Sequence, residues 1–444
     1  MIGDALRLAP RVAAHRSTTA HLGAAYPFVS DGGLGGSGVV VGRDMAGSAF
    51  AFDPFELYRQ GMLTSPNMIV CGQIGRGKSA FVKTYLWRQS LFGRRSWVID
   101  PKGEYGSLAA AWGVTPIRLA PGGDVRLNPL DLPSALPVTG GGRPGADEAD
   151  RRRMDLLGAL GAACLARPVR AVERAAIEIA LTSLARAGSD GLRRRRCADA
   201  PGGPPTLPEV VDALLDPDPI AAQAIGFDAA TLAAESRELA LELRRLVRGD
   251  LRGMFDGPTS PDIALDASLV VLDLSAVYAS DALGILIACA TAWLEGARAR
   301  IDGARGTLIV VDEAWAILSD ISVARWLQSS WKLARAYGVS NIAVLHRLSD
   351  LRAAGAEGSQ QAGLAGGLLS DSETRVIYAQ APGEVEAARE ALSLTTTERD
   401  LLPRLGRGVA LWKVADRSFL VRHILSASET ALVDTDAAMV PPVA

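Results

Sequence analysis

The sequence predicts an α/β fold in which a mainly parallel sheet is interrupted by an all-helical insertion. Short, fully apolar segments recur along the chain, for example at residues 68–71 (MIVC) and 307–311 (TLIVV). Such segments are typical of strands in a parallel sheet that helices cover on both faces. Helical patterns separate these strands, and from residue 146 to about residue 255 the apolar spacing is helical throughout. We therefore expect one α/β core that a helical domain divides, instead of three domains in series.

The N-terminal segment is predicted to hold only short strands. Residues 30–42 are rich in glycine and end in a run of valines, which favours a loop that leads into a short strand and a turn. No helix pattern follows this glycine-rich stretch, so a flexible connection is favoured over a nucleotide-binding loop here.

The core is predicted to begin with a strand at residues 68–71, a glycine turn at 72–77 and a helix at 78–90. The next strand, at residues 96–99, ends at Asp100, and the glycine-rich segment 140–145 then reads as a linker. This order of strand, helix and strand is typical of a parallel sheet.

The insertion is predicted to contain helices at residues 147–165, 169–187, 207–215 and 228–247. Thr206, followed three residues later by Glu209, predicts a capping box at the start of the third helix. Two clusters of arginine lie in this region, at 151–153 and 193–196. Solvated positions are favoured for both, and contact with a phosphate backbone or a protein partner is the alternative.

The sheet is predicted to resume after the insertion. The expected strands are residues 269–274, 307–311, 341–345, 375–380 and 408–414, and the expected helices are 281–300 and 323–337. The predicted division of the chain is 1–60 for the N-terminal segment, 61–140 for the first part of the core, 141–256 for the insertion, 257–435 for the second part of the core and 436–444 for a tail.

Composition excludes several classes of protein. The 444 residues contain 48% hydrophobic residues, which is enough for a sizeable core and argues against disorder. The 47 basic and 49 acidic residues give no overall attraction to nucleic acid or anionic lipid. Four scattered cysteines, Cys71, Cys164, Cys197 and Cys289, have no metal-binding spacing and favour a reduced, cytoplasmic protein.

Neither a membrane span nor a signal peptide is predicted. The longest apolar run, residues 283–294, falls short of the roughly 18 residues that a span requires. We expect a cytoplasmic protein that associates with the membrane only through its partners.

A phosphate-binding motif follows the first core strand. Residues 72–79 (GQIGRGKS) match the P-loop, or Walker A, pattern GxxxxGK[ST], and they lie between a strand and a helix, as the pattern requires. Backbone N–H groups of such a turn and the N-terminus of the helix attract phosphate. Lys78 is expected to reach the β- and γ-phosphates of ATP, and Ser79 to bind Mg²⁺. The predicted nucleotide-binding residues of this segment are Gly72, Gln73, Ile74, Gly75, Arg76, Gly77, Lys78, Ser79 and Ala80.

Two acidic residues end the strand at 307–311. Asp312 is expected to hold Mg²⁺ through water, and Glu313 to act as the general base on the attacking water. Acidic residues here also suit the first turn of a helix, but beside a P-loop the catalytic interpretation is favoured. A pair of carboxylates favours hydrolysis over simple nucleotide sensing.

Three further motifs carry a family resemblance. The P-loop is followed by DPKGEY at residues 100–105, LNPL at 127–130 and VVDEAW at 310–315. In this order the motifs resemble the ATPases of conjugative type IV secretion, TraC/VirB-type motors within the HerA/FtsK superfamily of hexameric P-loop ATPases. The resemblance implies a RecA-like core. Asp100 and Glu104, at the end of a strand, are expected near the nucleotide.

The resemblance continues downstream with two further residues. Arg335 matches an arginine of the family, and His346 stands where the family usually has glutamine, at the end of a strand and before Ser349-Asp350. The resemblance implies a mechanistic role for both, with a purely structural role for His346 left open. Arg335 and Arg375 are the two candidates for a finger that reaches the nucleotide of a neighbouring subunit.

The predicted function is a Mg²⁺-dependent ATPase motor that powers a conjugative or type IV secretion apparatus, with ATP and Mg²⁺ as cofactors. We expect a homo-hexamer, because a P-loop site without a cationic group of its own commonly borrows an arginine from the next subunit. Expected partners are components of the membrane channel and a DNA or protein substrate. The alternatives are a ring-shaped DNA translocase and a nucleotide-gated assembly scaffold.

Overall fold

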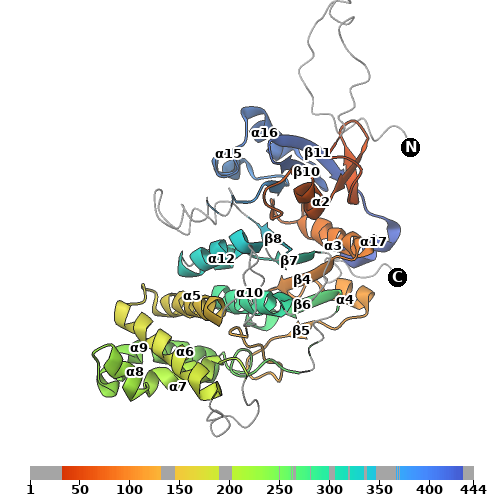
Figure 1. Cartoon of the computed structure of the whole chain (residues 1–444). Helices are drawn as coiled ribbons and strands as arrows, with labels where there is room; N and C mark the ends of the chain where they lie inside the picture. The colour runs from red at the N-terminus through yellow and green to blue at the C-terminus, as the bar shows by residue number, and fades with distance from the viewer. Residues whose placement is uncertain are drawn as a thin grey trace, which may run out of the picture.

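Eleven strands of the described residues form one mixed sheet (Figure 1). The computed structural model describes residues 33–131, 146–189, 203–249, 251–261, 267–280, 282–299, 306–318, 321–334, 338–346 and 371–433, together with 263, 367 and 369. The strands are β1 (Val39–Asp44), β2 (Ala49–Phe52), β3 (Met68–Cys71), β4 (Arg95–Asp100), β5 (Ile117–Arg118), β6 (Leu269–Asp273), β7 (Thr307–Val311), β8 (Val339–Leu345), β9 (Thr374–Ile377), β10 (Val409–Val414) and β11 (Arg417–His423). Their order across the sheet is β2-β1-β11-β10-β9-β3-β8-β7-β4-β6-β5.

The sheet has a parallel part and an antiparallel part. Strands β9, β3, β8, β7, β4, β6 and β5 pair in parallel, while β10, β11, β1 and β2 add antiparallel pairs beyond β9. The carboxyl ends of the parallel strands therefore meet at one edge, where ligands bind in sheets of this kind. This arrangement confirms the predicted α/β fold.

The short strands predicted for the N-terminal segment are present, and they extend this sheet, which was not predicted. Strand β1 pairs with β11 so that Gly42 faces His423. A Cβ atom at Gly42 would lie 1.9 Å from the carbonyl oxygen of Arg422. Only glycine therefore allows this close approach of the two strands. The pairing joins segments far apart in the chain, which local sequence patterns do not reveal.

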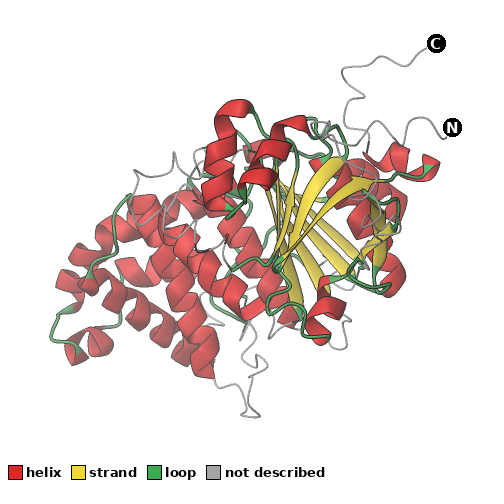
Figure 2. Cartoon of the chain, turned by 90° about the horizontal axis from the view of Figure 1, so that it is seen from above, coloured by secondary structure: helices red, strands yellow, loops and turns green. Residues whose placement is uncertain are grey.

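Helices cover both faces of the sheet (Figure 2), and strands β3, β4, β6, β7, β8, β9 and β10 contribute alternate side chains to two cores, one on either face. In β7, Ile309 and Val311 enter one core, and Leu308 and Val310 enter the other. The first core is covered by α10 (Leu283–Ala299), α12 (Ile321–Leu333) and the insertion, and the second by α3 (Lys78–Gln89), α4 (Gly106–Trp112) and α17 (Ala427–Val433). Burial on both faces explains the uninterrupted apolar sequence of these strands.

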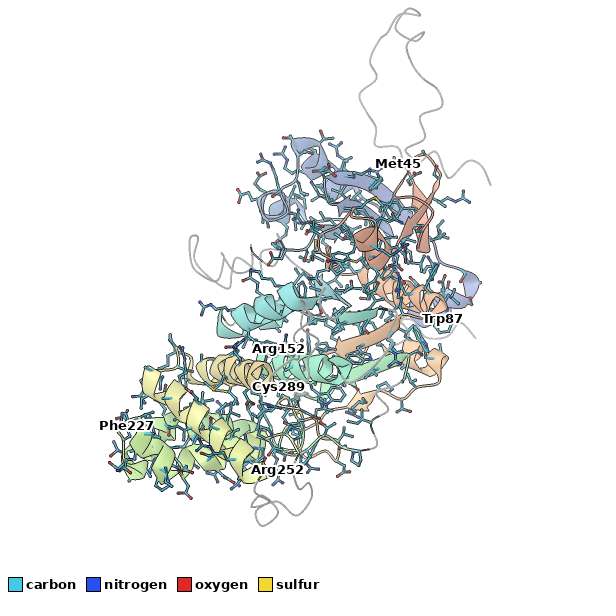
Figure 3. The ribbon with its side chains drawn as sticks, in the orientation of Figure 1. Met45, Trp87, Arg152, Phe227, Arg252 and Cys289 are labelled. Atoms are coloured by element: carbon cyan, nitrogen blue, oxygen red, sulfur yellow. The ribbon has the colours of Figure 1, made fainter. Side chains whose placement is uncertain are left out.

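The insertion contains five helices among the described residues: α5 (Ala146–Leu165), α6 (Ala171–Ser189), α7 (Leu207–Leu215), α8 (Pro219–Ala224) and α9 (Ala229–Arg248). The four predicted helices and the capping box of Thr206 and Glu209 are confirmed, with the N–H of Thr206 2.8 Å from Oε2 of Glu209. The short helix α8, capped by Asp218, was not predicted. Helix α5 packs against α12, whereas Phe227 lies at the far end of the insertion (Figure 3).

Of the two arginine clusters, the first is described and 193–196 lies outside the described residues. Arg153 is buried, not solvated as expected: its Nε donates to the carbonyl oxygen of Leu130 at 3.0 Å, and its guanidinium pairs with Asp150. This contact fixes the start of the insertion to the core.

The shorter helices are α2 (Pro54–Arg59), α11 (Trp315–Leu318), α15 (Val385–Ala391) and α16 (Thr396–Leu401), with 3₁₀ turns η2 (Ser90–Phe92), η4 (Ser275–Val277), η6 (Pro382–Glu384) and η7 (Leu402–Arg404). Among the described residues, Cys71, Cys164 and Cys289 form no disulfide bond, and Cys197 lies outside the described residues. Within the described part of the chain, no helix has both the length and the apolar character that a membrane crossing needs.

Candidate nucleotide-binding site

A glycine turn joins β3 to α3 at the carboxyl edge of the sheet. Gly72, Gly75 and Gly77 have positive φ angles of 145°, 75° and 111°, a region that favours glycine. A Cβ atom at Gly72 would lie 2.6 Å from the Cβ of Tyr378. The predicted strand, turn and helix are thus present, and the turn requires glycine for both its conformation and its packing.

The turn is fixed to the strands beside β3. The N–H of Gln73 donates to the carbonyl oxygen of Ala379 at 2.9 Å. The N–H of Gly408 donates to the carbonyl oxygen of Arg76, also at 2.9 Å. Ile74, at the tip, is 74% exposed. The supporting residues after β9 and before β10 were not predicted as part of the site, because no local motif marks them.

Lys78 folds back over the turn. Its Nζ donates to the carbonyl oxygens of Gly72 at 2.5 Å and Gln73 at 2.9 Å. Burial lowers the pKa of Lys78 to about 8, although the charges of Asp312 and Glu313 oppose this shift. The ammonium therefore lies in a site where an additional anion is electrostatically favourable.

The N-terminus of α3 lies at the same place. Its cap residue, Gly77, makes no side-chain capping hydrogen bond, and Ser79 and Ala80 are partly exposed in the first turn. Free N–H groups and the helix dipole at such a terminus attract phosphate. The role of the Ser79 hydroxyl as a Mg²⁺ ligand stays a prediction.

Asp312 is buried at the carboxyl end of β7. Its N–H donates to the carbonyl oxygen of Ile99, and the hydroxyl of Tyr105 donates to its Oδ2 at 3.4 Å. Burial and the neighbouring charge of Glu313 raise the pKa of Asp312. A buried carboxylate with a raised pKa favours a nearby cation.

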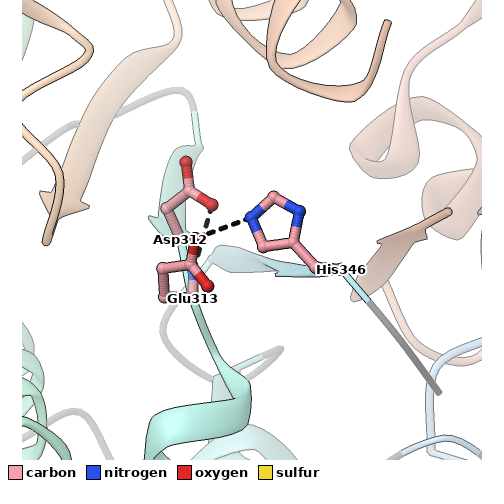
Figure 4. A group of neighbouring side chains, drawn as sticks. All are labelled: Asp312, Glu313 and His346. Atoms are coloured by element: carbon pink, nitrogen blue, oxygen red, sulfur yellow. Dashed lines mark hydrogen bonds and ion pairs between the residues drawn. The ribbon is translucent and has the colours of Figure 1, made fainter. Parts of the chain in front are cut away.

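Glu313 follows with a left-handed backbone (φ 53°) and a carboxylate held by three donors. Nε2 of His346 lies 2.6 Å from Oε1 of Glu313, Lys102 forms an ion pair with the same oxygen, and the indole N–H of Trp315 donates to Oε2. Burial alone would raise the pKa of Glu313, but the hydrogen bonds from His346 and Lys102 lower it to about 2. Figure 4 shows the side chains of Asp312, Glu313 and His346 converging.

Lys102 and Trp315 are contacts that the sequence did not identify as site residues. Burial alone would lower the pKa of Lys102, but the hydrogen bond and charge of Glu313 raise it. Its Nζ lies 3.1 Å from Nε2 of His346. Lys102 thus adds a second ammonium to the site beside that of Lys78, and whether a neighbouring subunit also supplies an arginine stays a prediction. The signal was available, since Lys102 lies in DPKGEY directly after a strand.

Asp100 organises the turn that carries Lys102. Its carboxylate accepts backbone hydrogen bonds from Lys102 (3.2 Å), Gly103 (2.9 Å), Glu104 (3.1 Å) and Tyr105 (2.9 Å). These bonds give Asp100 a positioning role. Glu104 is partly buried and close enough to Asp312 for its charge to help raise the pKa of that residue. Direct contact of Asp100 or Glu104 with nucleotide stays a prediction.

The two arginine candidates differ in their surroundings. Arg335 lies outside the described residues. The guanidinium of Arg375 donates to the carbonyl oxygens of Leu392 at 3.0 Å and Leu369 at 3.2 Å within the same chain. Burial lowers the pKa of Arg375. These contacts bind the Arg375 guanidinium to its own chain, and the choice between Arg335 and Arg375 as the finger stays a prediction.

The donor set around Asp312 fits Mg²⁺. Ligand atoms of Asp312, Glu313 and His346 lie within 4.8 Å of one another. Mg²⁺ prefers oxygen ligands, and Oε1 of Glu313 is already in contact with both the Lys102 ammonium and Nε2 of His346. Of these three residues, Asp312 is therefore the most suitable ligand for the ion, and its pairing with Ser79 stays a prediction.

Comparisons with known proteins identify the fold. VirB4 of Thermoanaerobacter pseudethanolicus matches at 23% identity with a TM-score of 0.68, over 90% of this chain and 100% of that chain. The plasmid coupling protein TrwB in complex with ADP and Mg²⁺ matches at 13% identity with a TM-score of 0.55, over 88% of this chain and 91% of that chain. An unbound form of the bacterial conjugative coupling protein TrwBdeltaN70 matches at 14% identity with a TM-score of 0.54, over 87% and 90%. No family model matches the chain, and no curated protein gives a significant match.

These matches span nearly the whole chain, insertion included. They confirm the predicted RecA-like P-loop NTPase core with an all-helical insertion, and the chain shares this fold with VirB4 and TrwB.

Proposed function

We propose that the chain is a Mg²⁺-dependent ATPase motor of a conjugative or type IV secretion apparatus. The observation that carries the proposal is the meeting of Lys78, Asp312 and Glu313 at the carboxyl edge of one parallel sheet. An ammonium for the phosphates, a carboxylate for the metal and a second carboxylate for water are what ATP hydrolysis needs.

The structural matches support the choice of biological setting. TrwB is described as a plasmid coupling protein and was solved with ADP and Mg²⁺, and VirB4 has the same fold as this chain. By analogy, we propose that the chain binds ATP and Mg²⁺, assembles into a homo-hexamer and works with channel components at the cytoplasmic face of a membrane. Its substrate is then DNA or a protein.

In the proposed mechanism, Lys78 and the N-terminus of α3 bind the phosphates, while Ser79 and Asp312 position the metal. Magnesium, when bound, would neutralise charge on the phosphates. Glu313 orients and deprotonates the attacking water. His346 contributes by fixing the carboxylate of Glu313, and this contact gives a physical basis to the mechanistic role that the resemblance implies for His346.

A DNA translocase is the second candidate, and DNA distinguishes it from a protein-transfer motor. We would measure ATP turnover of the purified chain with increasing duplex DNA at several salt concentrations, together with its mass with and without Mg²⁺-ATP. A protein-transfer motor turns over ATP with little response to DNA. Strong stimulation by DNA that falls steeply with salt would instead support the translocase, because phosphate contacts release counterions.

A nucleotide-gated scaffold is the third candidate. It predicts that Mg²⁺-ATP changes the mass of the assembly while turnover is absent at saturating ATP. Such a result would contradict the motor.

A further inference from the structure

The backbone of Lys102 is fixed by hydrogen bonds, whereas its ammonium lies at the end of a flexible side chain. The four hydrogen bonds to Asp100 fix the turn, and Gly103 takes a positive φ of 72° there. The Lys102 side chain is 26% exposed, in contrast to 2% for that of Glu313. An ammonium on a flexible stem can change partner without moving the backbone.

Three side chains contact the carboxylate of Glu313, and they differ in how readily they can move away from it. Trp315 lies two residues away in the same turn, and His346 directly follows the neighbouring strand β8. Both are ring donors on fixed elements. Lys102 carries its charge at the end of a flexible stem, so its position responds most to an added negative charge.

Nucleotide would bring that charge to the same place. Lys78, the residue expected to meet the β- and γ-phosphates, is close enough to Lys102 for their charges to act on each other. The Lys102 ammonium already pairs with the carboxylate of Glu313, which carries a single negative charge. A γ-phosphate carries more charge and more acceptor oxygens, so it competes for the same ammonium.

We propose that Lys102 senses the γ-phosphate and controls Glu313. Without a triphosphate, Lys102 pairs with Oε1 of Glu313 and occupies the oxygen that the attacking water needs. When ATP binds, Lys102 moves to the γ-phosphate and releases Oε1 as an acceptor for that water. ADP has no γ-phosphate and leaves the pair closed. This proposal rests on the proposed ATPase function and adds regulation of the same site.

Two binding ratios follow. Wild-type protein binds a non-hydrolysable ATP analogue about tenfold more tightly than ADP, and Lys102→Met reduces this preference to about twofold, because the γ-phosphate loses its ammonium partner. Lys102→Arg keeps the charge and restores most of the preference.

Glu313→Gln removes the competing anion, so the analogue binds more tightly than to wild type while ADP affinity is unchanged. Lys102→Met combined with Glu313→Gln shows no such gain.

The fluorescence of Trp315 reports on the carboxylate of Glu313. If Lys102 had only a structural role, its replacement would not alter the response of this fluorescence to nucleotide. The indole N–H is bonded to Glu313, so its fluorescence depends on the state of that carboxylate. With Mg²⁺ present, the ATP analogue changes the emission of wild-type protein and ADP does not. Trp315→Phe loses the difference and identifies its source among the eight tryptophans. Lys102→Met also loses it, although Trp315 is present.

The experiment is titration of the 444-residue chain with both nucleotides, by calorimetry and by fluorescence, with circular dichroism to verify folding of each variant. If Lys102→Met and Lys102→Arg keep the wild-type ratio and the wild-type emission change, the sensor proposal is overturned while the ATPase proposal stands. If wild-type protein binds neither nucleotide, both proposals are overturned. Should Lys102→Met not fold, Lys102→Gln replaces it under the same criteria.

Discussion

The ammonium of Lys78 donates a hydrogen bond to the carbonyl oxygen of Gly72, six residues before it, across 2.5 Å. This contact closes the glycine turn over its own lysine. Because the ammonium is buried and its pKa is lowered to about 8, the proton is held less tightly than in an exposed lysine. A phosphate that displaces the carbonyl oxygens would supply charge that the carbonyl groups lack.

Replacement of this lysine is the first prediction. Lys78→Ala should reduce ATP affinity and lower turnover by about 100-fold or more, since the phosphates lose their buried cation. Arg59→Ala is the matched control, because Arg59 is largely exposed and pairs only with acidic groups of its own helix among its described ion pairs. Equal turnover in Lys78→Ala and wild type would contradict the assignment of the turn.

Gly72 provides a steric prediction. Gly72→Ala places a methyl group 2.6 Å from the Cβ of Tyr378 at a φ of 145°, so either the turn or the start of the segment after β9 must move. We expect a loss of about 2–4 kcal/mol in the free energy of unfolding. Urea unfolding measures it. Gly383→Ala, which meets no atom within 4 Å, should be neutral, and equal stability of the two variants would contradict the packing described.

His423 gives a prediction about pH. The hydroxyl of Thr84 donates to the carbonyl oxygen of Ala80 at 2.8 Å, so its oxygen accepts from Nε2 of His423 at 2.9 Å. Burial, with the nearby charge of Arg88, lowers the pKa of His423 to about 4.

The direction of the pH effect follows from a comparison of the folded and unfolded chains. In the unfolded chain histidine titrates near 6.5, so as the pH falls it binds a proton before His423 does in the folded chain. The contribution of His423 is therefore complete above pH 6.5 and is lost as the pH falls toward 4. Between pH 7.5 and pH 5, wild-type protein should lose on the order of 2 kcal/mol more stability than His423→Gln. Urea unfolding at the two pH values checks this, and parallel losses in both proteins would refute it.

Two glycines of α5 test the packing of the insertion. A Cβ at Gly161 would lie 2.6 Å from Cδ1 of Leu239 on α9, whereas a Cβ at Gly158 meets no atom within 4 Å. Gly161→Leu should lower the free energy of unfolding by about 1–3 kcal/mol through overpacking. Gly158→Leu should be neutral or raise it by up to about 1 kcal/mol through helix propensity. Thermal unfolding that ranks the pair in the opposite order would contradict this arrangement.

The parts of the fold that depend on local pattern were predictable. The strand at residues 68–71, the helix that starts at Lys78, the strand that ends before Asp312 and the four long helices of the insertion follow from apolar spacing and capping. In these segments each strand is buried on both faces or each helix has one apolar side, so neighbouring residues carry the information.

Contacts between distant segments were not predictable from pattern. The pairing of β1 with β11, the packing of Tyr378 on Gly72 and the ion pair of Lys102 with Glu313 all join residues that no spacing rule relates. His346 was identified through the family resemblance alone, and its contact with Glu313 gives that position a physical role. Register between strands depends on the whole sheet, which a single segment does not encode.

The central claim is that Glu313 acts on the water that attacks ATP. Glu313→Gln keeps the shape of the side chain and removes its capacity to take a proton. The most direct measurement compares nucleotide affinity and steady-state ATP turnover of wild type and Glu313→Gln in saturating Mg²⁺. We predict that ATP binding is retained or strengthened while turnover falls about 100-fold or more. Turnover by Glu313→Gln equal to that of wild type would contradict the account.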